Sequence, residues 1–221
     1  MAEERLMIPS EGILLEARWE KGAGGHTVIL CHPHPLYSGS MDNNVVEAVQ
    51  GAFSRMGWGT LRFNFRGVGR SGGSHTHGRG ETLDLLGVAS HLSTKTKGLI
   101  HLTGYSYGAW IALQAVSQGL EPASLILISP PLNLIDFGKL RFPSCPVLVA
   151  AGDEDEFCST DTLRSWFDVV GKNHEMAELQ ILPGCDHFYW GLERRLTDRL
   201  LKFLGRYFCA DDAGRNPTSG R

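Results

Sequence analysis

A serine lies at the centre of the pentapeptide GYSYG, residues 104–108, which fits the pattern Gly-x-Ser-x-Gly. A strand-like apolar segment precedes the motif, and a segment with helical spacing follows it. A serine on such a sharp strand-to-helix turn projects its hydroxyl above a sheet. Gly104 and Gly108 are expected because larger side chains would collide across the turn. The helix that starts here directs amide N–H groups toward the serine. Ser106 is therefore the candidate nucleophile.

A serine hydroxyl needs a base to take its proton, and the base needs an acid to orient it. Two later loops supply both, because each follows an apolar strand-like segment: AGDEDEF at 151–157 and GCDHFYWG at 184–191. His187 is the only histidine after the last expected strand, and we expect it to be the base, with His174 as the alternative. The acid is expected among the aspartates of the first loop.

The elements that must position these residues alternate between strands and helices. Strands are expected at 13–20, 26–31, 58–65, 98–104, 123–129, 145–152 and 177–184, and helices at 43–57, 81–92, 106–119, 159–170 and 187–208. This alternation indicates an α/β fold, a mostly parallel sheet of about seven to eight strands with helices on both faces. Ligands in such sheets bind beyond the carboxyl ends of the strands. The short stretch between residues 130 and 145 leaves no room for a large lid.

Length and composition narrow the class of protein. The chain has 221 residues, which favours one domain; we expect it over 1–208, followed by a disordered polar tail over 209–221. The formal charge is −3 and the sequence has no basic run, so it lacks the basic patch that is typical of nucleic-acid-binding proteins. No apolar run is long enough to span a bilayer, and the N-terminus has no signal core, so the cytoplasm is expected. The 5 cysteines are widely spaced without a CxxC pair, which is typical of free thiols.

The motif-bearing stretches together resemble the α/β-hydrolase superfamily, and most closely its small lidless bacterial branch related to dienelactone hydrolases. They are HPHPLYSGSMDNNVV, LRFNFRGVGRSGG, GYSYGAW, AGDEDEF and CDHFYWG, spread over residues 32–191. In that family the acid lies three residues after the glycine that ends its strand, so the resemblance implies Asp155 in preference to Asp153. Dienelactone hydrolase itself uses a cysteine where this chain has Ser106, which argues against dienelactone chemistry.

The stretch HPHP, residues 32–35, follows the strand at 26–31, where related hydrolases carry H-G-x-P. In those enzymes this loop supplies a backbone N–H that binds the oxyanion. Proline has no N–H, so the donor is expected to be the amide of His34, with Leu36 as the alternative. The amide of Tyr107, directly after the nucleophile, is the other expected donor.

The histidines of this stretch also allow a competing interpretation. His32 and His34, with His75 and His77, could form a four-histidine metal site. Their spacing does not favour this over chance, so no metal is expected. The ring of His32 is instead expected to be buried and bonded to the loop backbone, whereas that of His34 could line the pocket.

Together these residues predict a serine hydrolase that cleaves small carboxylic esters or thioesters without a cofactor. Ser106 would form an acyl-enzyme, His187 would transfer the proton, and Asp155 would orient His187. Tyr37 and Phe188, which flank the motifs, are the candidate substrate contacts. The expected partner is a small-molecule ester, with no nucleic acid and no membrane, and no oligomeric state is predicted.

Two rival interpretations stay open. An amidase, a peptidase or an acyltransferase would use the same three side chains, and a substrate panel would separate these activities. A non-catalytic binding scaffold of the same fold would show ligand affinity without reactivity at Ser106. The complete set of nucleophile, base, acid and oxyanion loops argues against the scaffold.

Overall fold

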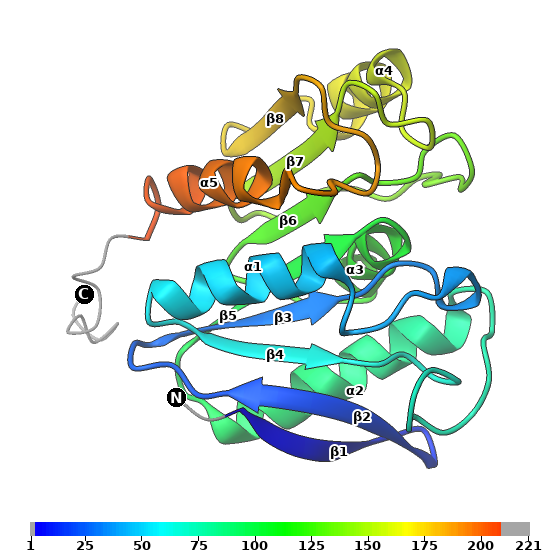
Figure 1. Cartoon of the computed structure of the whole chain (residues 1–221), viewed down its shortest axis with the longest axis vertical. Coiled ribbons are helices and arrows are strands. Elements are labelled where there is room, and N and C mark those ends of the chain that lie inside the picture. The colour runs from blue at the N-terminus through cyan, green and yellow to red at the C-terminus, as the bar shows by residue number, and fades with distance from the viewer. Residues whose placement is uncertain (1–2, 209–221) are drawn as a thin grey trace.

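A computed structural model of the chain describes residues 3–208, in which eight strands form one sheet in the order β1-β2-β4-β3-β5-β6-β7-β8 (Figure 1). The strands are β1 (Glu4–Ser10), β2 (Ile13–Glu20), β3 (His26–Cys31), β4 (Gly59–Phe63), β5 (Leu99–Tyr105), β6 (Leu125–Ile128), β7 (Val147–Gly152) and β8 (Ala177–Leu182). Only β2 runs antiparallel to its neighbours β1 and β4, and the pairs from β4 to β8 are parallel. The expected mostly parallel sheet is thus confirmed.

Helices cover both faces of this sheet, as Figure 1 shows. They are α1 (Asn44–Arg55), α2 (Arg79–Lys95), α3 (Tyr107–Ser117), α4 (Thr160–Val170) and α5 (Glu193–Leu204), with a short 3-10 helix η1 (Pro35–Tyr37). α1 and α5 bury their apolar stripes on one face, and α2, α3 and α4 contribute to the core on the other. Every residue of β3, β4 and β7 is buried, as expected for strands covered on both sides. None of the helices within residues 3–208 combines the length and hydrophobicity that crossing a bilayer requires.

Two elements differ from the sequence-based expectation. No strand is predicted before residue 13, yet β1 forms at the edge of the sheet. Its exposed positions carry charged side chains, so the segment lacks the apolar run that is typical of a buried strand. The last helix begins at Glu193 and not at 187, because Tyr189 and Gly191 take φ values of 56° and 74°, outside the helical region. The oxygen Oδ1 of Asp186 accepts the N–H groups of Phe188 and Tyr189, which stabilises this turn.

The carboxyl ends of the parallel strands meet at one edge of the sheet, on the side of the arrowheads in Figure 1. The loops after β3, β5, β7 and β8 leave from this edge, so they bring the sequence motifs together. Between β6 and β7, residues 129–146 contain neither helix nor strand, in agreement with the expected absence of a large lid. The tail predicted to be disordered, 209–221, lies outside the described residues.

Candidate active site

Ser106 lies in a strained turn between β5 and α3, with φ 54° and ψ −120°. The two glycines of the motif are required by close backbone contacts. A Cβ on Gly104 would lie 2.2 Å from the carbonyl oxygen of Gly108, and one on Gly108 would lie 2.4 Å from that of Cys31. Both distances are far below van der Waals contact, so only glycine allows β5 and α3 to meet β3 this closely. The strain at Ser106 is held by the surrounding backbone.

Three side chains from three loops form a continuous hydrogen-bonded chain. The Ser106 hydroxyl Oγ lies 2.9 Å from Nε2 of His187, and Nδ1 of His187 lies 2.8 Å from each carboxylate oxygen of Asp155. All three residues are buried, Ser106 with 7 % of its surface exposed. The donor order Ser106 to His187, and His187 to Asp155, is the arrangement in which a histidine can take a serine proton.

The two alternatives considered from the sequence lie elsewhere. Oδ1 of Asp153 accepts the backbone N–H of Gly184 at 2.6 Å and thereby connects the loops after β7 and β8. His174 Nε2 donates to the carbonyl of Pro143 at 2.7 Å. The structure therefore brings Asp155 and His187, and neither alternative, to Ser106.

Two buried tyrosines hold the loop that carries His187, and the sequence analysis did not assign them a role. The hydroxyl of Tyr105 donates to the backbone carbonyl of His187 at 2.8 Å, and the hydroxyl of Tyr189 lies 2.8 Å from Oγ of Ser129. Burial raises the pKa of both phenols, so they stay neutral. In the sequence these tyrosines stand out only as aromatic residues next to the motifs. Their hydrogen-bond partners lie 60 or more residues away in the chain, so the sequence does not reveal the contacts.

Of the two amides expected as oxyanion donors in the loop after β3, one is free and the other is hydrogen-bonded. Within residues 3–208, the N–H groups of His34 and Tyr107 have no hydrogen-bond acceptor. The N–H of Leu36 is bonded to Nδ1 of His34 at 3.1 Å, and the N–H of Tyr37 to the His34 carbonyl at 3.0 Å. Leu36 is thus occupied, whereas the amides of His34 and Tyr107 are available to bind an anion.

His32, one of the four histidines considered as metal ligands, uses both ring nitrogens for contacts with the backbone. His32 is fully buried, its Nδ1 lies 2.6 Å from the carbonyl of Pro33, and its Nε2 accepts the N–H of Phe65 at 3.0 Å. Burial lowers the pKa of His32 to about 4, so this ring is neutral and connects β3 to the end of β4. Nowhere in the described part of the chain do three or more metal-binding side chains gather.

His75 of the glycine-rich loop lies beside a buried carboxylate. Its Nδ1 lies 3.0 Å from Oε1 of Glu81, which has no exposed surface and also accepts the N–H groups of Thr76 and Gly78 at 2.8 Å. Burial raises the pKa of Glu81, but these hydrogen bonds outweigh it and leave the pKa below its usual value. The ring of His34 lies 5.0 Å from that of His75, so this loop supports the loop after β3.

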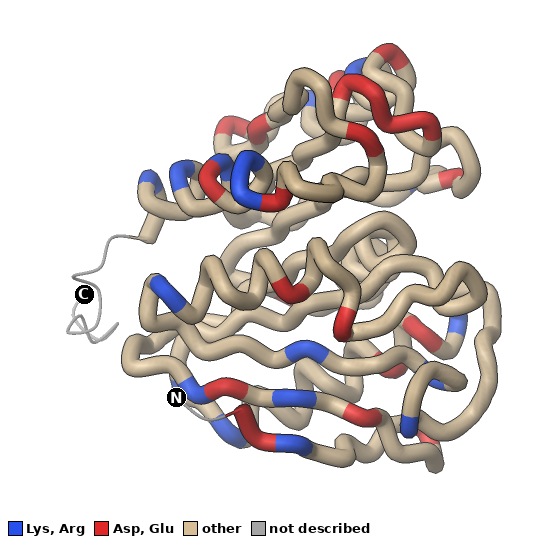
Figure 2. The backbone as a smooth tube through the Cα atoms, in the orientation of Figure 1, with Lys and Arg blue, Asp and Glu red and all other residues tan. Residues whose placement is uncertain are grey.

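Two kinds of exposed side chain lie on the loops at the edge of the sheet that carries Ser106. Large exposed apolar residues, here called the apolar rim, come from the loops at this edge of the sheet: Leu36, Tyr37, Leu134, Phe188 and Trp190. On the side of β7 and β8 the loops are acidic, with exposed Asp153, Glu154, Glu156 and Asp186 (Figure 2). Residues 142–163 contain no lysine or arginine. The site is therefore open, with apolar and acidic surroundings.

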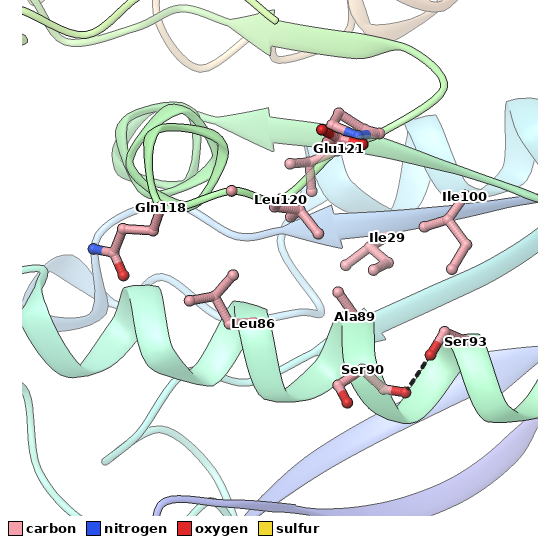
Figure 3. A pocket seen from close by; sticks show the side chains of 12 residues that line it. Ile29, Leu86, Ala89, Ser90, Ser93, Ile100, Gln118, Leu120 and Glu121 are labelled. Carbon is pink, nitrogen blue, oxygen red and sulfur yellow. Dashed lines mark hydrogen bonds between the residues drawn. The ribbon is translucent and has the colours of Figure 1, made fainter.

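A cleft of about 370 Å³ lies away from this site, between α2 and the end of α3 (Figure 3). It extends over Ile29 of β3 and Ile100 at the amino end of β5, whereas Ser106 follows the carboxyl end of β5. None of the residues of the hydrogen-bonded chain lines it, so the cleft is not the place where Ser106 meets a substrate.

Comparisons with known proteins agree with this fold. No known protein-family profile matches the sequence. An uncharacterized protein of Rickettsia prowazekii (strain Madrid E) is 33 % identical over 202 residues, which cover 87 % of this chain and 83 % of that protein.

Two solved structures are similar over nearly their whole length. A lidless α/β serine hydrolase from Xanthomonas campestris has a TM-score of 0.86 at 30 % identity, covering 95 % of this chain and 96 % of its own. An α/β serine hydrolase homologue from Coxiella burnetii has a TM-score of 0.84 at 32 % identity, covering 92 % and 98 %. With its mostly parallel sheet, its Gly-x-Ser-x-Gly turn and these relatives, the chain belongs to the α/β-hydrolase superfamily.

Proposed function

We propose that the protein is a serine hydrolase that cleaves small carboxylic esters or thioesters through an acyl-enzyme. One observation carries the proposal: Ser106, His187 and Asp155 form an unbroken hydrogen-bonded chain. The unoccupied amides of His34 and of Tyr107, the residue after the nucleophile, support it. A chain of this kind raises the nucleophilicity of a serine, and free amides stabilise the negative charge that develops on a carbonyl oxygen.

In the first half-reaction, Oγ of Ser106 attacks the substrate carbonyl carbon while Nε2 of His187 takes the serine proton. Asp155 accepts the hydrogen bond from Nδ1 and stabilises the imidazolium that forms. The carbonyl oxygen becomes an oxyanion, which the N–H groups of His34 and Tyr107 bind. His187 then donates its proton to the leaving alcohol or thiol, and the acyl group stays on Ser106.

In the second half-reaction, His187 removes a proton from water, and the resulting hydroxide attacks the acyl-enzyme. The same two amides bind the second oxyanion. Collapse of this intermediate releases the carboxylic acid, and the proton on His187 returns to Ser106. In total, one ester and one water are consumed, and one carboxylic acid and one alcohol are formed, so the reaction requires no cofactor.

The surroundings of the serine favour neutral, apolar esters. Tyr37 is 81 % exposed and Phe188 is 44 % exposed, and both rings belong to loops that carry proposed catalytic groups. Apolar surface of this kind gains free energy when a substrate covers it, and we assign Tyr37 and Phe188 to substrate binding. The acidic loops after β7 and β8 disfavour esters that carry a carboxylate.

The decisive experiment is the intact mass of the protein after treatment with a fluorophosphonate. Wild type is expected to gain one phosphonyl group on Oγ of Ser106, with loss of fluoride, whereas Ser106→Ala gains none. Ser117→Ala, which alters an exposed helix serine, is the matched control and should be labelled fully. Absence of labelling on folded wild type would contradict the proposal and favour the binding scaffold.

A substrate panel then separates ester hydrolysis from the activities that share the same chemistry. Neutral p-nitrophenyl esters, thioesters, aminoacyl amides and an anionic ester are compared at equal concentration. Hydrolysis of the neutral esters or thioesters above the amides is expected. Faster amide cleavage would show an amidase, and product formation only with an added alcohol acceptor would show an acyltransferase.

A further inference from the structure

We propose that the imidazole of His34 is a positioning group of the oxyanion hole, in addition to the role of its backbone N–H. By accepting the N–H of Leu36, the ring holds the loop in the conformation in which the His34 N–H is free. This inference rests on the proposed function, because an oxyanion hole acts only if Ser106 carries out acyl transfer.

The hydrogen bond from Leu36 to the His34 ring fixes the loop locally. It runs from the N–H of Leu36 to Nδ1 of His34 over 3.1 Å, and it joins residues only two positions apart. Side chains that accept from the amide two residues on hold a turn, as aspartate and asparagine do. The acceptor must be an unprotonated nitrogen, so the neutral ring with its proton on Nε2 is the form that makes this bond.

The prolines on either side do not replace this bond. A proline restricts its own φ and biases the preceding residue toward extended ψ, and His34 indeed has φ −58° and ψ 123°. The direction of the His34 N–H also depends on rotation about its own N–Cα bond. That rotation is limited by the Leu36 bond to the ring and the Tyr37 bond to the carbonyl, both made within the same turn.

The same ring touches the residue that carries the other oxyanion amide. Its centroid lies 4.5 Å from the ring of Tyr107 and 5.0 Å from that of His75. His75 in turn lies 3.0 Å from the carboxylate of Glu81, a residue of α2 with no exposed surface. The His34 ring is therefore supported from outside the loop, and it couples the positions of the two free amides.

Burial and the nearby His75 lower the pKa of His34, which keeps the ring able to accept a hydrogen bond at neutral pH. The groups that face it are Tyr37, His75, His77, Glu81 and Tyr107, of which Glu81 favours the charged ring and the histidines disfavour it. The ring thus remains an acceptor under the conditions in which His187 must also be neutral to act as a base.

Two substitutions separate the acceptor from the bulk of the ring. His34→Phe keeps an aromatic ring but cannot accept the Leu36 N–H, whereas His34→Asn keeps an acceptor at the i, i+2 position without the ring. With p-nitrophenyl butyrate, we expect kcat of His34→Phe to fall about 10- to 100-fold with KM within about twofold. His34→Asn should keep kcat within about threefold of wild type. His77→Asn, which changes an exposed histidine of the same cluster, is the control and should match wild type.

The outcomes distinguish this inference from the proposed function. The inference is overturned if His34→Phe keeps the wild-type kcat, or if both His34 variants lose kcat equally. In either case the proposed function still stands as long as ester hydrolysis depends on Ser106. Hydrolysis that survives in Ser106→Ala overturns both. Thermal unfolding identifies a variant that does not fold. If His34→Phe is such a variant, His34→Ala takes its place, with the same expected loss of kcat and the same rescue by His34→Asn.

Discussion

The hydroxyl of Tyr105 donates a hydrogen bond of 2.8 Å to the backbone carbonyl of His187, so the residue before the nucleophile holds the loop of the base. Tyr105 is the last residue of β5 and is buried, with 3 % of its surface exposed. The bond connects the central strand to a loop that has no helical or strand hydrogen bonds of its own around His187. The distance between Ser106 and His187 therefore depends on a buried tyrosine outside the hydrogen-bonded chain of Ser106, His187 and Asp155.

Replacement of this tyrosine tests the connection. Tyr105→Phe removes the donor and leaves the buried carbonyl of His187 without a partner, which should cost about 1–3 kcal/mol of unfolding free energy. We expect kcat to fall about tenfold with little change in KM, because a displaced base weakens proton transfer more than binding. Steady-state kinetics and urea unfolding measure both effects. Tyr207→Phe, a surface change, is the control, and equal kinetics in both variants would contradict the role of Tyr105.

The two aspartates after β7 should behave differently. Asp155→Asn removes the charge that orients His187 and favours its protonated form, and kcat is expected to fall about 10³- to 10⁴-fold. Asp153→Asn keeps an acceptor for the N–H of Gly184 and should stay within about threefold of wild type. Rates of p-nitrophenyl ester hydrolysis decide between them. The reverse result would assign the acid to Asp153.

Stability should fall as the pH is lowered, because of two buried histidines. Burial lowers the pKa of His101 to about 3, with a further contribution from His26, and burial lowers that of His32 to about 4. Below pH 6.5 the histidines of the unfolded chain bind protons that those of the folded protein do not. Their contribution to the free energy of unfolding is therefore fully present above this pH and is lost as the pH falls toward 4. From about pH 7.5 to about pH 5 we expect a loss of about 2 kcal/mol per histidine.

Urea unfolding at the two pH values measures this loss. His101→Gln should reduce the difference between the two pH values by about 2 kcal/mol, although the variant is less stable at neutral pH because Ser124 and His26 lose their partner ring. His77→Asn, at an exposed position, is the control and should keep the whole difference. A pH-dependent loss that is unchanged in His101→Gln would show that other groups cause it.

The apolar rim should set the preference for acyl chain length. Tyr37→Ser and Phe188→Ser remove exposed rings from opposite loops of the site, and each should lower kcat/KM for p-nitrophenyl octanoate about 10-fold. The acetate ester, which is too short to cover the rim, should react within about twofold of wild type. Leu99→Ser, a half-exposed apolar residue at the amino end of β5, is the control. An equal loss for both esters would assign the rings to loop stability.

The sequence by itself was sufficient for the residues whose function depends on local spacing. Gly104 and Gly108 flank Ser106 because the turn between a buried strand and a helix has no room for a Cβ. The pentapeptide motif alone therefore indicates this turn. The alternation of apolar strands and helices likewise predicted the parallel sheet, and its carboxyl edge predicted that Ser106, His187 and an aspartate of the loop at 151–157 would meet. The preference for Asp155 over Asp153 came from the family resemblance. Prolines, which lack an N–H, limited the amides of the loop after β3 to His34 and Leu36.

Tertiary structure alone decided the contacts between residues far apart in the chain. The bond from Tyr105 to His187 and the bond between Ser129 and Tyr189 join residues 82 and 60 positions apart, and they depend on three-dimensional distances, which periodicity does not encode. The predicted helix over 187–208 was wrong at its start, because Asp186 and Tyr189 satisfy their polar groups with a turn and with Ser129 in place of a helical ladder. A buried polar group stabilises whichever conformation gives it a partner, and such partners exist only once the chain has folded.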